Sequence, residues 1–400
     1  MKSNMTNMSH VKTEKTRETA PYHIAFGILS ALAILMVVAG HAGYDILTVG
    51  GLFPYYSFHV PLFMFISGYF YREGEEENPL FYLKKKAKRL LMPYFVWNLI
   101  YGVIAWTLRT FGGFALGNAI SLKSLFLDPF LNGYQFIYNF AAWFVPVLFL
   151  IEIMNLCMRL LLKKVRLDSE WLILFGTLLL GMAVVQLSIG GHVWGWYKTP
   201  GRILFLYPCF QMGQFYRKKL EARDTLGNLP YFTLVIGVQV VLSLCCNGLA
   251  YSSVWCTGFA NGPVIPYVTV VTGVAFWLRV AKILASLYGN SVQNPAGGFL
   301  LYLGRNTYAV MMHHIMAFML VKMILAGIAA RTGYPADFDF TEFHSNIDYY
   351  YLVKGSEAFR MVYLAAGIAL PLLLQRGVEV LLSAAGRLLP IPGREKGAPE

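Results

Sequence analysis

Long apolar stretches dominate this sequence, and they restrict its possible folds more than any other feature does. The hydrocarbon core of a bilayer is about 30 Å thick, and a helix of roughly 20 apolar residues spans it. Ten stretches reach that length or come close to it. They cover residues 22–42, 53–71, 90–112, 140–162, 170–189, 202–217, 230–249, 263–287, 306–330 and 361–384. The sequence therefore predicts an all-α, polytopic integral membrane protein with about ten transmembrane helices.

The composition supports a membrane protein. Hydrophobic residues make up 57% of the chain and charged residues only 14%, whereas a soluble protein needs more polar surface to cover its core. The aromatic content of 16% is typical of helices that Trp and Tyr anchor at the level of the lipid headgroups. Residues 1–21 are polar and the stretch after them is long enough to span, so we expect no cleavable signal peptide.

The basic residues predict the orientation of the chain. Segments rich in Lys and Arg alternate with segments that are poor in them, and cytoplasmic loops carry the excess. The rich segments are the N-terminal tail, 72–89, 159–166, 217–223, 279–305 and the C-terminal tail. Both termini are therefore expected in the cytoplasm. The same placement accounts for the net charge of +12, so we do not expect a nucleic acid partner.

The chain shows no second domain. Neither tail is long enough to fold alone, so we expect a cytoplasmic tail over residues 1–21, one membrane-embedded domain over 22–385 and a cytoplasmic tail over 386–400. The five cysteines show no CxxC pair and no metal-ligand spacing, and we interpret them as small packing residues. No metal site is predicted.

Two histidines are the first candidates for chemistry, because ionisable groups inside membrane helices are costly and often functional. His41 ends the first apolar stretch on the outer side, and His59 lies early in the second. The short loop between them makes the two helices antiparallel neighbours, so the imidazoles could act as general base and as orienting or proton-relay group. Histidines that cap helix ends are an equally good interpretation. Pro61 and Ser67-Gly68 predict a kinked, closely packed second helix.

Other ionisable residues are open to two interpretations. Glu152, within the fourth stretch, needs either a basic partner or its own proton, and it could bind substrate or donor as well as form a structural pair. His313 and His314 are adjacent, and adjacent helical side chains point about 100° apart, so at most one of them faces a given site. Arg305 and the run Lys84–Arg89 lie at the inner edge. They could bind the phosphates of a nucleotide or serve as ordinary positive-inside anchors.

Six motifs, taken in order, resemble those of membrane acyltransferase family 3. They read ALAILMVVAGHAG, FHVPLFMFISGYFYR, KKKAKRLLMPYFVW, AAWFVPVLFLIEI, RILFLYPCFQMGQFYRKK and LLYLGRNTYAVMMHHIMAF, and they cover residues from about 25 to 325. The second motif is similar to the branch that includes fucose 4-O-acetylases and the polysaccharide intercellular adhesin acetylase.

The resemblance implies a ten-helix protein of the bacterial plasma membrane. It implies that an acyl group, usually acetyl, passes from cytoplasmic acyl-CoA to a hydroxyl of an extracytoplasmic glycan or lipid-linked sugar. Acetyl-CoA is then a donor substrate, and no bound cofactor is implied. His41 occupies the position of the family's essential histidine. Arg305 and Asn306 match a Gly-Arg-Asn turn, and His313 or His314 matches the histidine that follows it.

The chain departs from the family at one position. An arginine is usual eleven residues before the essential histidine, and Ser30 stands there instead. Arg89, Arg202 or Arg305 could replace its contact with the acyl donor. We therefore expect a membrane O-acetyltransferase in which His41 is the general base or accepts the acyl group itself, while His59 orients it. The alternatives are a glycan or lipid-sugar exporter without catalysis, which consumes no acyl-CoA, and a partner or sensor subunit.

Overall fold

The computed structural model describes residues 21–43, 47–133, 136–288 and 294–388. The two expected cytoplasmic tails lie largely outside these residues. Within the described part of the chain, helices are joined by loops, and β-structure is limited to two isolated bridges. The α-helices are α1 Pro21–His41, α2 His59–Tyr69, α3 Pro79–Lys86, α4 Met92–Gly112, α5 Asp128–Leu131, α6 Phe144–Lys164, α7 Glu170–Ile189, α8 Lys198–Phe215, α9 Asn228–Cys245, α10 Ile265–Tyr288, α11 Pro295–Arg305, α12 Thr307–Thr332, α13 Phe340–Ser345 and α14 Arg360–Leu388. Three tighter or wider turns also bear on the site, namely η1 Tyr55–Ser57, η3 Ala87–Leu91 and η5 Ile137–Trp143.

Eight helical segments in the described residues are long and apolar enough to cross a membrane. They are Ile24–His41, Pro79–Gly112, Ile137–Lys164, Glu170–Ile189, Asn228–Cys245, Ile265–Tyr288, Thr307–Thr332 and Glu357–Ala384. The chain is thus a polytopic, all-helical membrane protein. The stretches expected at 53–71 and 202–217 do not reach this standard. The first forms only the eleven-residue α2, and the second forms α8, which carries Lys198 and Arg202. A count of ten spans stays a prediction.

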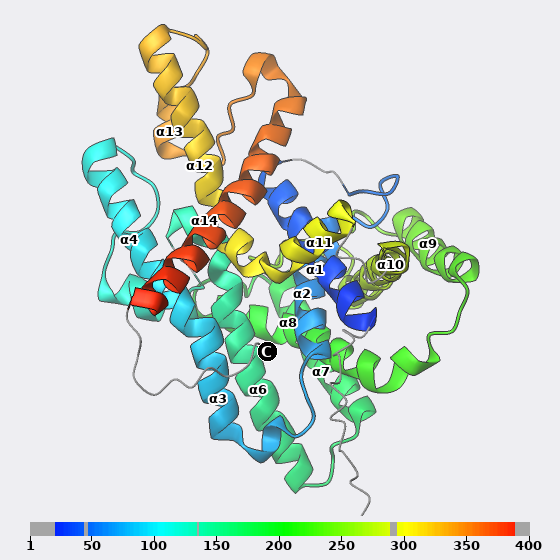
Figure 1. Cartoon of the computed structure of the whole chain (residues 1–400). Coiled ribbons are helices and arrows are strands. Elements are labelled where there is room, and N and C mark those ends of the chain that lie inside the picture. Colours follow the sequence, from blue (N-terminus) through cyan, green and yellow to red (C-terminus); the bar gives the residue numbers. More distant parts are fainter. Residues whose placement is uncertain (1–20, 44–46, 134–135, 289–293, 389–400) are drawn as a thin grey trace, which may run out of the picture.

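Helices α2 and α8 pack closely against each other near the middle of the bundle (Figure 1). A Cβ on Gly68 would overlap the carbonyl of Phe210, and a Cβ on Gly213 would overlap the carbonyl of Phe65. The close approach predicted at Ser67-Gly68 is therefore confirmed. The kink predicted at Pro61 is wrong, because α2 begins only at His59. Pro61 lies in its first turn, where a missing N–H breaks no helical hydrogen bond.

The run Lys84–Arg89, expected in a loop, is helical. Asn78 caps the start of α3, accepting a hydrogen bond from the N–H of Phe81, and Pro79 occupies the first turn. The helix then continues through the π-helical turn η3 into α4. Pro93 explains the wider turn, because it has no N–H for the carbonyl of Arg89 four residues earlier. The extension carries these basic side chains on a rigid element.

Burial separates central helices from peripheral ones. Of the apolar window in α1, 72% is buried inside the protein, whereas only 17% of the window in α9 is buried. Helix α9 exposes large apolar side chains such as Leu234 and Leu244. Apolar faces of this kind on an outer helix suit contact with lipid. Helix α1 packs against α2, α10, α11 and α12, so the helix that ends in His41 lies at the centre of the protein (Figure 1).

The two ends of the bundle differ in character. At one end, which we call the basic end, lie the start of α3 and the end of α6 with Lys163 and Lys164 (bottom of Figure 1). At the other end, the loop end, α13 packs beside the C-terminal parts of α4 and α12 (top of Figure 1). The segment between α12 and α14 packs here around Phe338 and Phe343, whose ring centroids are 5.5 Å apart.

Candidate functional site

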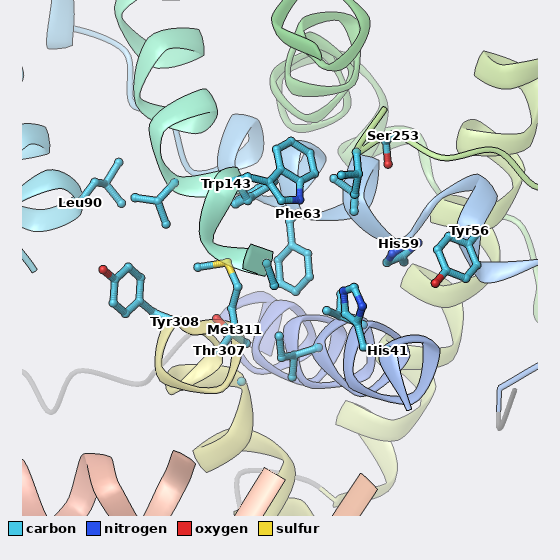
Figure 2. Close-up of a pocket in the computed structure, with 18 of the residues that line it drawn as sticks. His41, Tyr56, His59, Phe63, Leu90, Trp143, Ser253, Thr307, Tyr308 and Met311 are labelled. Carbon is cyan, nitrogen blue, oxygen red and sulfur yellow. The ribbon is translucent and has the colours of Figure 1, made fainter. Parts of the chain in front are cut away.

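A cavity of about 590 Å³ lies between α1, α2, α6 and α12, and we call it the His41 cavity. Its lining comprises Ile34, Val37, His41, Tyr56, His59, Val60, Phe63, Arg89, Leu90, Ala141, Trp143, Phe144, Val145, Ser252, Ser253, Val254, Gly304, Arg305, Thr307, Tyr308 and Met311. Figure 2 shows that His41, His59, Tyr56 and Ser253 gather at one end, with Leu90 and Tyr308 at the other. Phe63 and Trp143 lie between them. The cavity therefore has apolar walls and polar groups at both ends.

The histidine end is formed where α1 stops and α2 begins. A Cβ on Gly40 would lie 2.7 Å from the Tyr55 ring, so glycine lets Tyr55 approach the last turn of α1. The backbone carbonyl of Tyr55 accepts a hydrogen bond from Nδ1 of His59 at 2.6 Å. Arg360, at the start of α14, donates to the carbonyl of Ala42 at 3.1 Å. A guanidinium at a helix C-terminus satisfies a free carbonyl and complements the helix dipole. His41 and His59, expected to approach each other, are thus held at the same end of one cavity.

The opposite end of the cavity carries two exposed arginines. Arg89 lies in η3, and Arg305 ends α11. Neither forms an ion pair with a described residue, so both guanidinium groups are available to a ligand. Gly304 places Arg305, because a Cβ there would overlap the carbonyl of Gly27 on α1. Asn306 closes the turn from α11 to α12, with its side-chain amide donating to the carbonyl of Tyr302 at 2.8 Å.

Glu152 lies outside the cavity and has the basic partner that its burial requires. Nζ of Lys86 is 2.6 Å from Oε1 of Glu152, and the hydroxyl of Tyr82 donates to Oε2 at 3.3 Å. The carboxylate is only 4% exposed. The pair ties α3 to α6 immediately before η3, so Glu152 helps to position Arg89 rather than touching the contents of the cavity.

Arg202 also stands behind the cavity wall. Its guanidinium lies 4.4 Å from the ring centroid of Trp143. Nε donates to the carbonyl of Val254 at 2.5 Å, and a terminal nitrogen donates to the carbonyl of Gly133 at 3.2 Å. Both Trp143 and Val254 line the cavity. The structure therefore places Arg202 among supporting backbone carbonyls, apart from Arg89 and Arg305.

The adjacent histidines of α12 face different surroundings, as their 100° separation requires. His313 turns toward α4, where its Nδ1 is 2.8 Å from the hydroxyl of Tyr101 and its ring packs against Trp97. His314 turns toward α1, and its ring centroid is 5.2 Å from that of His41. Only His314 lies beside the cavity residues.

Sequence reasoning missed several residues that line the cavity. Tyr56, Ser253, Trp143 and Tyr308 bring hydroxyl or indole groups to it. Trp143 and Tyr308 lie within the motifs quoted above, but Tyr and Trp are frequent throughout this chain and nothing distinguishes these two from their neighbours. Ser30 does not line the cavity; it lies one turn before Ile34 on the same face of α1, and its hydroxyl donates to the carbonyl of Phe26 at 2.8 Å. Among the residues that the structure describes, no group of three or more His, Cys, Asp or Glu side chains is placed to hold a metal.

The arrangement as a whole suits transfer chemistry between two sides of a membrane. An anion could enter at the arginines, an apolar segment could fill the middle, and a neutral imidazole could accept a proton at the far end. No curated protein and no solved structure shows significant similarity to the chain. A family model described as an acyltransferase domain matches residues 25–371, which is most of the chain and includes every lining residue of the His41 cavity. The chain therefore belongs to membrane acyltransferase family 3.

Proposed function

We propose that this protein is an O-acyltransferase that moves an acetyl group from cytoplasmic acetyl-CoA to a hydroxyl of an extracytoplasmic glycan or lipid-linked sugar. One observation carries the proposal. A single cavity links Arg89 and Arg305, two exposed arginines without an ion-pair partner among the described residues, to His41, the residue in the position of the family's essential histidine. A donor that enters with its phosphates at one end would present its reactive carbon at the other.

The basic end faces the cytoplasm in this proposal, because cytoplasmic segments carry the excess of Lys and Arg. Arg89 and Arg305 then bind the phosphates of acetyl-CoA, since guanidinium groups form strong, charge-assisted hydrogen bonds to phosphate oxygens. They supply the positive charge that Ser30 does not. Arg305 is the better candidate of the two, because the contact of Gly304 with α1 fixes its distance from the cavity.

The middle of the cavity accommodates the pantetheine arm. Ile34, Val37 and His41 line it along α1, and seven residues of helix rise about 10 Å. Phe63, Trp143 and Met311 complete an apolar wall that a largely uncharged chain can occupy without desolvating a charge. The bilayer is the third partner, because it surrounds the peripheral helices.

Transfer then takes place at the histidine end. A nitrogen of His41 accepts the proton of the acceptor hydroxyl while that oxygen attacks the thioester carbon. The C–S bond breaks, the new C–O ester bond remains, and His41 returns the proton to the leaving thiolate of CoA. His59 and Tyr56, which line the same end, lie where the incoming hydroxyl would be oriented.

The first experiment measures release of free CoA from acetyl-CoA by detergent-purified protein, with an envelope-glycan extract as acceptor. His41→Ala should lose about 10²–10⁴-fold in turnover, the usual contribution of positioned acid–base catalysis. His192→Ala is the matched control, because His192 is an exposed loop histidine that does not line the cavity. Full activity in a well-folded His41→Ala protein would contradict the proposal. No CoA release and no acetyl-CoA binding by the unmodified protein would favour the exporter.

The donor site has its own test. Arg305→Gln should raise KM for acetyl-CoA about 10-fold and leave kcat nearly unchanged, because a phosphate contact remote from the reacting carbon contributes uniform binding. Lys163→Gln removes an exposed positive charge from the basic end without altering the cavity, and its KM should stay the same. An equal rise in KM for acetyl-CoA in the two variants would show that general surface charge, rather than Arg305, attracts the donor.

A further inference from the structure

His314 is a buried side chain that the proposed chemistry does not yet use. It is fully buried on α12, and its ring centroid lies 5.2 Å from that of His41 with the ring planes tilted by 36°. Phe318 packs edge-on against His314, with ring centroids 5.7 Å apart, and Phe140 packs edge-on against His41, at 5.0 Å. The two imidazoles are therefore in contact within a set of aromatic rings, with His314 buried and His41 at the cavity.

The hydrogen bonds of His314 fix its tautomer. Nδ1 lies 2.8 Å from the backbone carbonyl of Val310, one helical turn earlier. A carbonyl only accepts, so Nδ1 must carry the hydrogen, and in a neutral imidazole Nε2 is then an acceptor. Nε2 of His314 is buried and has no hydrogen-bond partner among the described residues. Burying an unpaired acceptor is costly, and such groups in folded proteins call for an explanation.

His59 has the same tautomer but a different position. Its Nδ1 donates to the carbonyl of Tyr55, so its Nε2 is also an acceptor. His59 lines the cavity, whereas His314 is absent from the lining and lies behind His41. A group that faces the cavity contacts substrate, and a group behind the base can only orient it. The sequence suggests His59 for orienting His41, whereas this geometry favours His314 for that role.

We propose that His314 is the positioning residue of the reaction: the two rings are in contact without a hydrogen bond in the structure, and a turn of the His41 ring brings its N–H to Nε2 of His314, which accepts the bond. This inference rests on the proposed function. Neutral His41 has one N–H, and giving it to His314 leaves the lone pair of the other nitrogen facing the cavity. That nitrogen takes the proton of the acceptor hydroxyl and later returns it to the thiolate. His314 gains no proton, and its bond stabilises the imidazolium that forms for the moment of transfer.

Two substitutions at His314 separate positioning from packing. Asn reproduces a donor near the Nδ1 position, so it keeps the bond to Val310, but it has no acceptor near Nε2. Gln extends further and can present its carbonyl oxygen near the Nε2 position. We expect His314→Asn to lower kcat about 10- to 100-fold, the range for losing a hydrogen bond to a charged group, with little change in KM for acetyl-CoA. His314→Gln should retain more than a third of kcat.

The kinetic outcomes are distinct. Recovery of kcat by Gln, but not by Asn, supports the assignment when His314→Met, which is close to Gln in volume but has no oxygen acceptor, is as impaired as His314→Asn. Equal losses in the two variants, or a loss confined to KM, would overturn it. His344→Asn is a matched control, because His344 also donates from Nδ1 to the carbonyl one turn earlier but lies on α13, outside the cavity.

A second measurement keeps this inference separate from the proposed function. Histidine-selective ¹⁵N labelling of the full chain gives the tautomer of each of its eight histidines, and the His41 signal is identified by its loss in His41→Ala. His41 should show one fixed tautomer in the unmodified protein and a mixture in His314→Asn. An unchanged His41 signal would overturn the hydrogen bond even in an active enzyme. If the protein released no CoA but its His41 signal changed in this way, acyl transfer would be refuted and the hydrogen bond between His41 and His314 would still be supported.

Discussion

The ion pair between Lys86 and Glu152 provides a direct test of how η3 is held against α6. Nζ of Lys86 is 2.6 Å from the carboxylate, which is 4% exposed, while the Lys86 side chain is 21% exposed. Lys86→Met leaves a buried carboxylate whose remaining hydrogen bond within the described residues comes from the Tyr82 hydroxyl. Glu152→Gln leaves a lysine that can turn toward water, and the amide oxygen still accepts from Tyr82.

These differences set the expected magnitudes. Breaking a buried pair costs about 3–5 kcal/mol when the remaining charge stays buried and unpaired. Because Tyr82 still donates to Glu152 and the pair is close to the surface, we expect about 2–3 kcal/mol for Lys86→Met. We expect about 1 kcal/mol for Glu152→Gln, since the long lysine side chain can reach solvent. The double variant should lose less than the sum of the single ones.

The assay is thermal unfolding of the detergent-purified protein followed by tryptophan fluorescence. Lys85→Met is the matched control in the same helix, because Lys85 pairs with Glu75 at 3.1 Å but is 44% exposed. Such a surface pair contributes about 0–1 kcal/mol. The unfolding midpoint should therefore fall in the order Lys86→Met, Glu152→Gln, Lys85→Met, with the largest fall first. Equal midpoints for Lys86→Met and Lys85→Met would refute the reasoning, because burial of the carboxylate would then carry no cost.

Two further predictions concern packing and pH. Gly68→Ala should lower the unfolding midpoint sharply, because the new Cβ overlaps the carbonyl of Phe210. Gly237→Ala is the control and should leave the midpoint unchanged or slightly raised, since nothing lies within 4 Å of a Cβ there. Similar midpoints for the two variants would disprove the close contact of α2 with α8. Burial raises the pKa of Asp224, but its bonds to Lys282 at 2.7 Å and Arg279 at 2.5 Å outweigh that effect, and the pKa lies below its usual value. The stabilisation by Asp224 is then complete above the unfolded pKa of about 3.9 and is lost as the pH falls through the lower folded pKa. Asp224→Asn should have a lower unfolding midpoint than the unmodified protein at pH 7, and the difference between the two midpoints should become smaller below about pH 4. A difference that stays constant with pH would show that the carboxylate charge contributes nothing.

The sequence predicted the helical membrane fold well, because spanning segments must satisfy all backbone groups internally and must be apolar along their length. It is less informative where helices do not face lipid. Helix α2 is short and enclosed by other helices, and α8 is long enough but carries Lys198 and Arg202 at its start. The length and apolarity expected of a spanning helix follow from its contact with lipid. These two criteria therefore do not identify helices that are surrounded by other helices.

The helical basic run was missed for a related reason. The residues Lys84–Arg89 are as polar as any loop, and positive-inside patterning describes which side they lie on without describing their conformation. The capping signal was present in Asn78-Pro79, a pair that starts a helix well. Reading the cap together with the charge pattern would have extended the third span toward the basic end.

In the candidate site, too, the sequence identified the polar residues and did not identify the apolar ones. His41, His59, Arg89 and Arg305 were all singled out, and all line one cavity, because an ionisable group near the membrane is costly unless it serves some purpose. Phe63, Trp143 and Met311 line the same cavity and were not found. In a soluble protein an apolar side chain usually indicates the interior. In a membrane protein the outer surface is equally apolar, so hydrophobic periodicity cannot distinguish a cavity wall from a lipid-facing side. Polar residues are therefore the only markers of such a site that one sequence provides, and the path between them becomes visible only when the helices are placed in space.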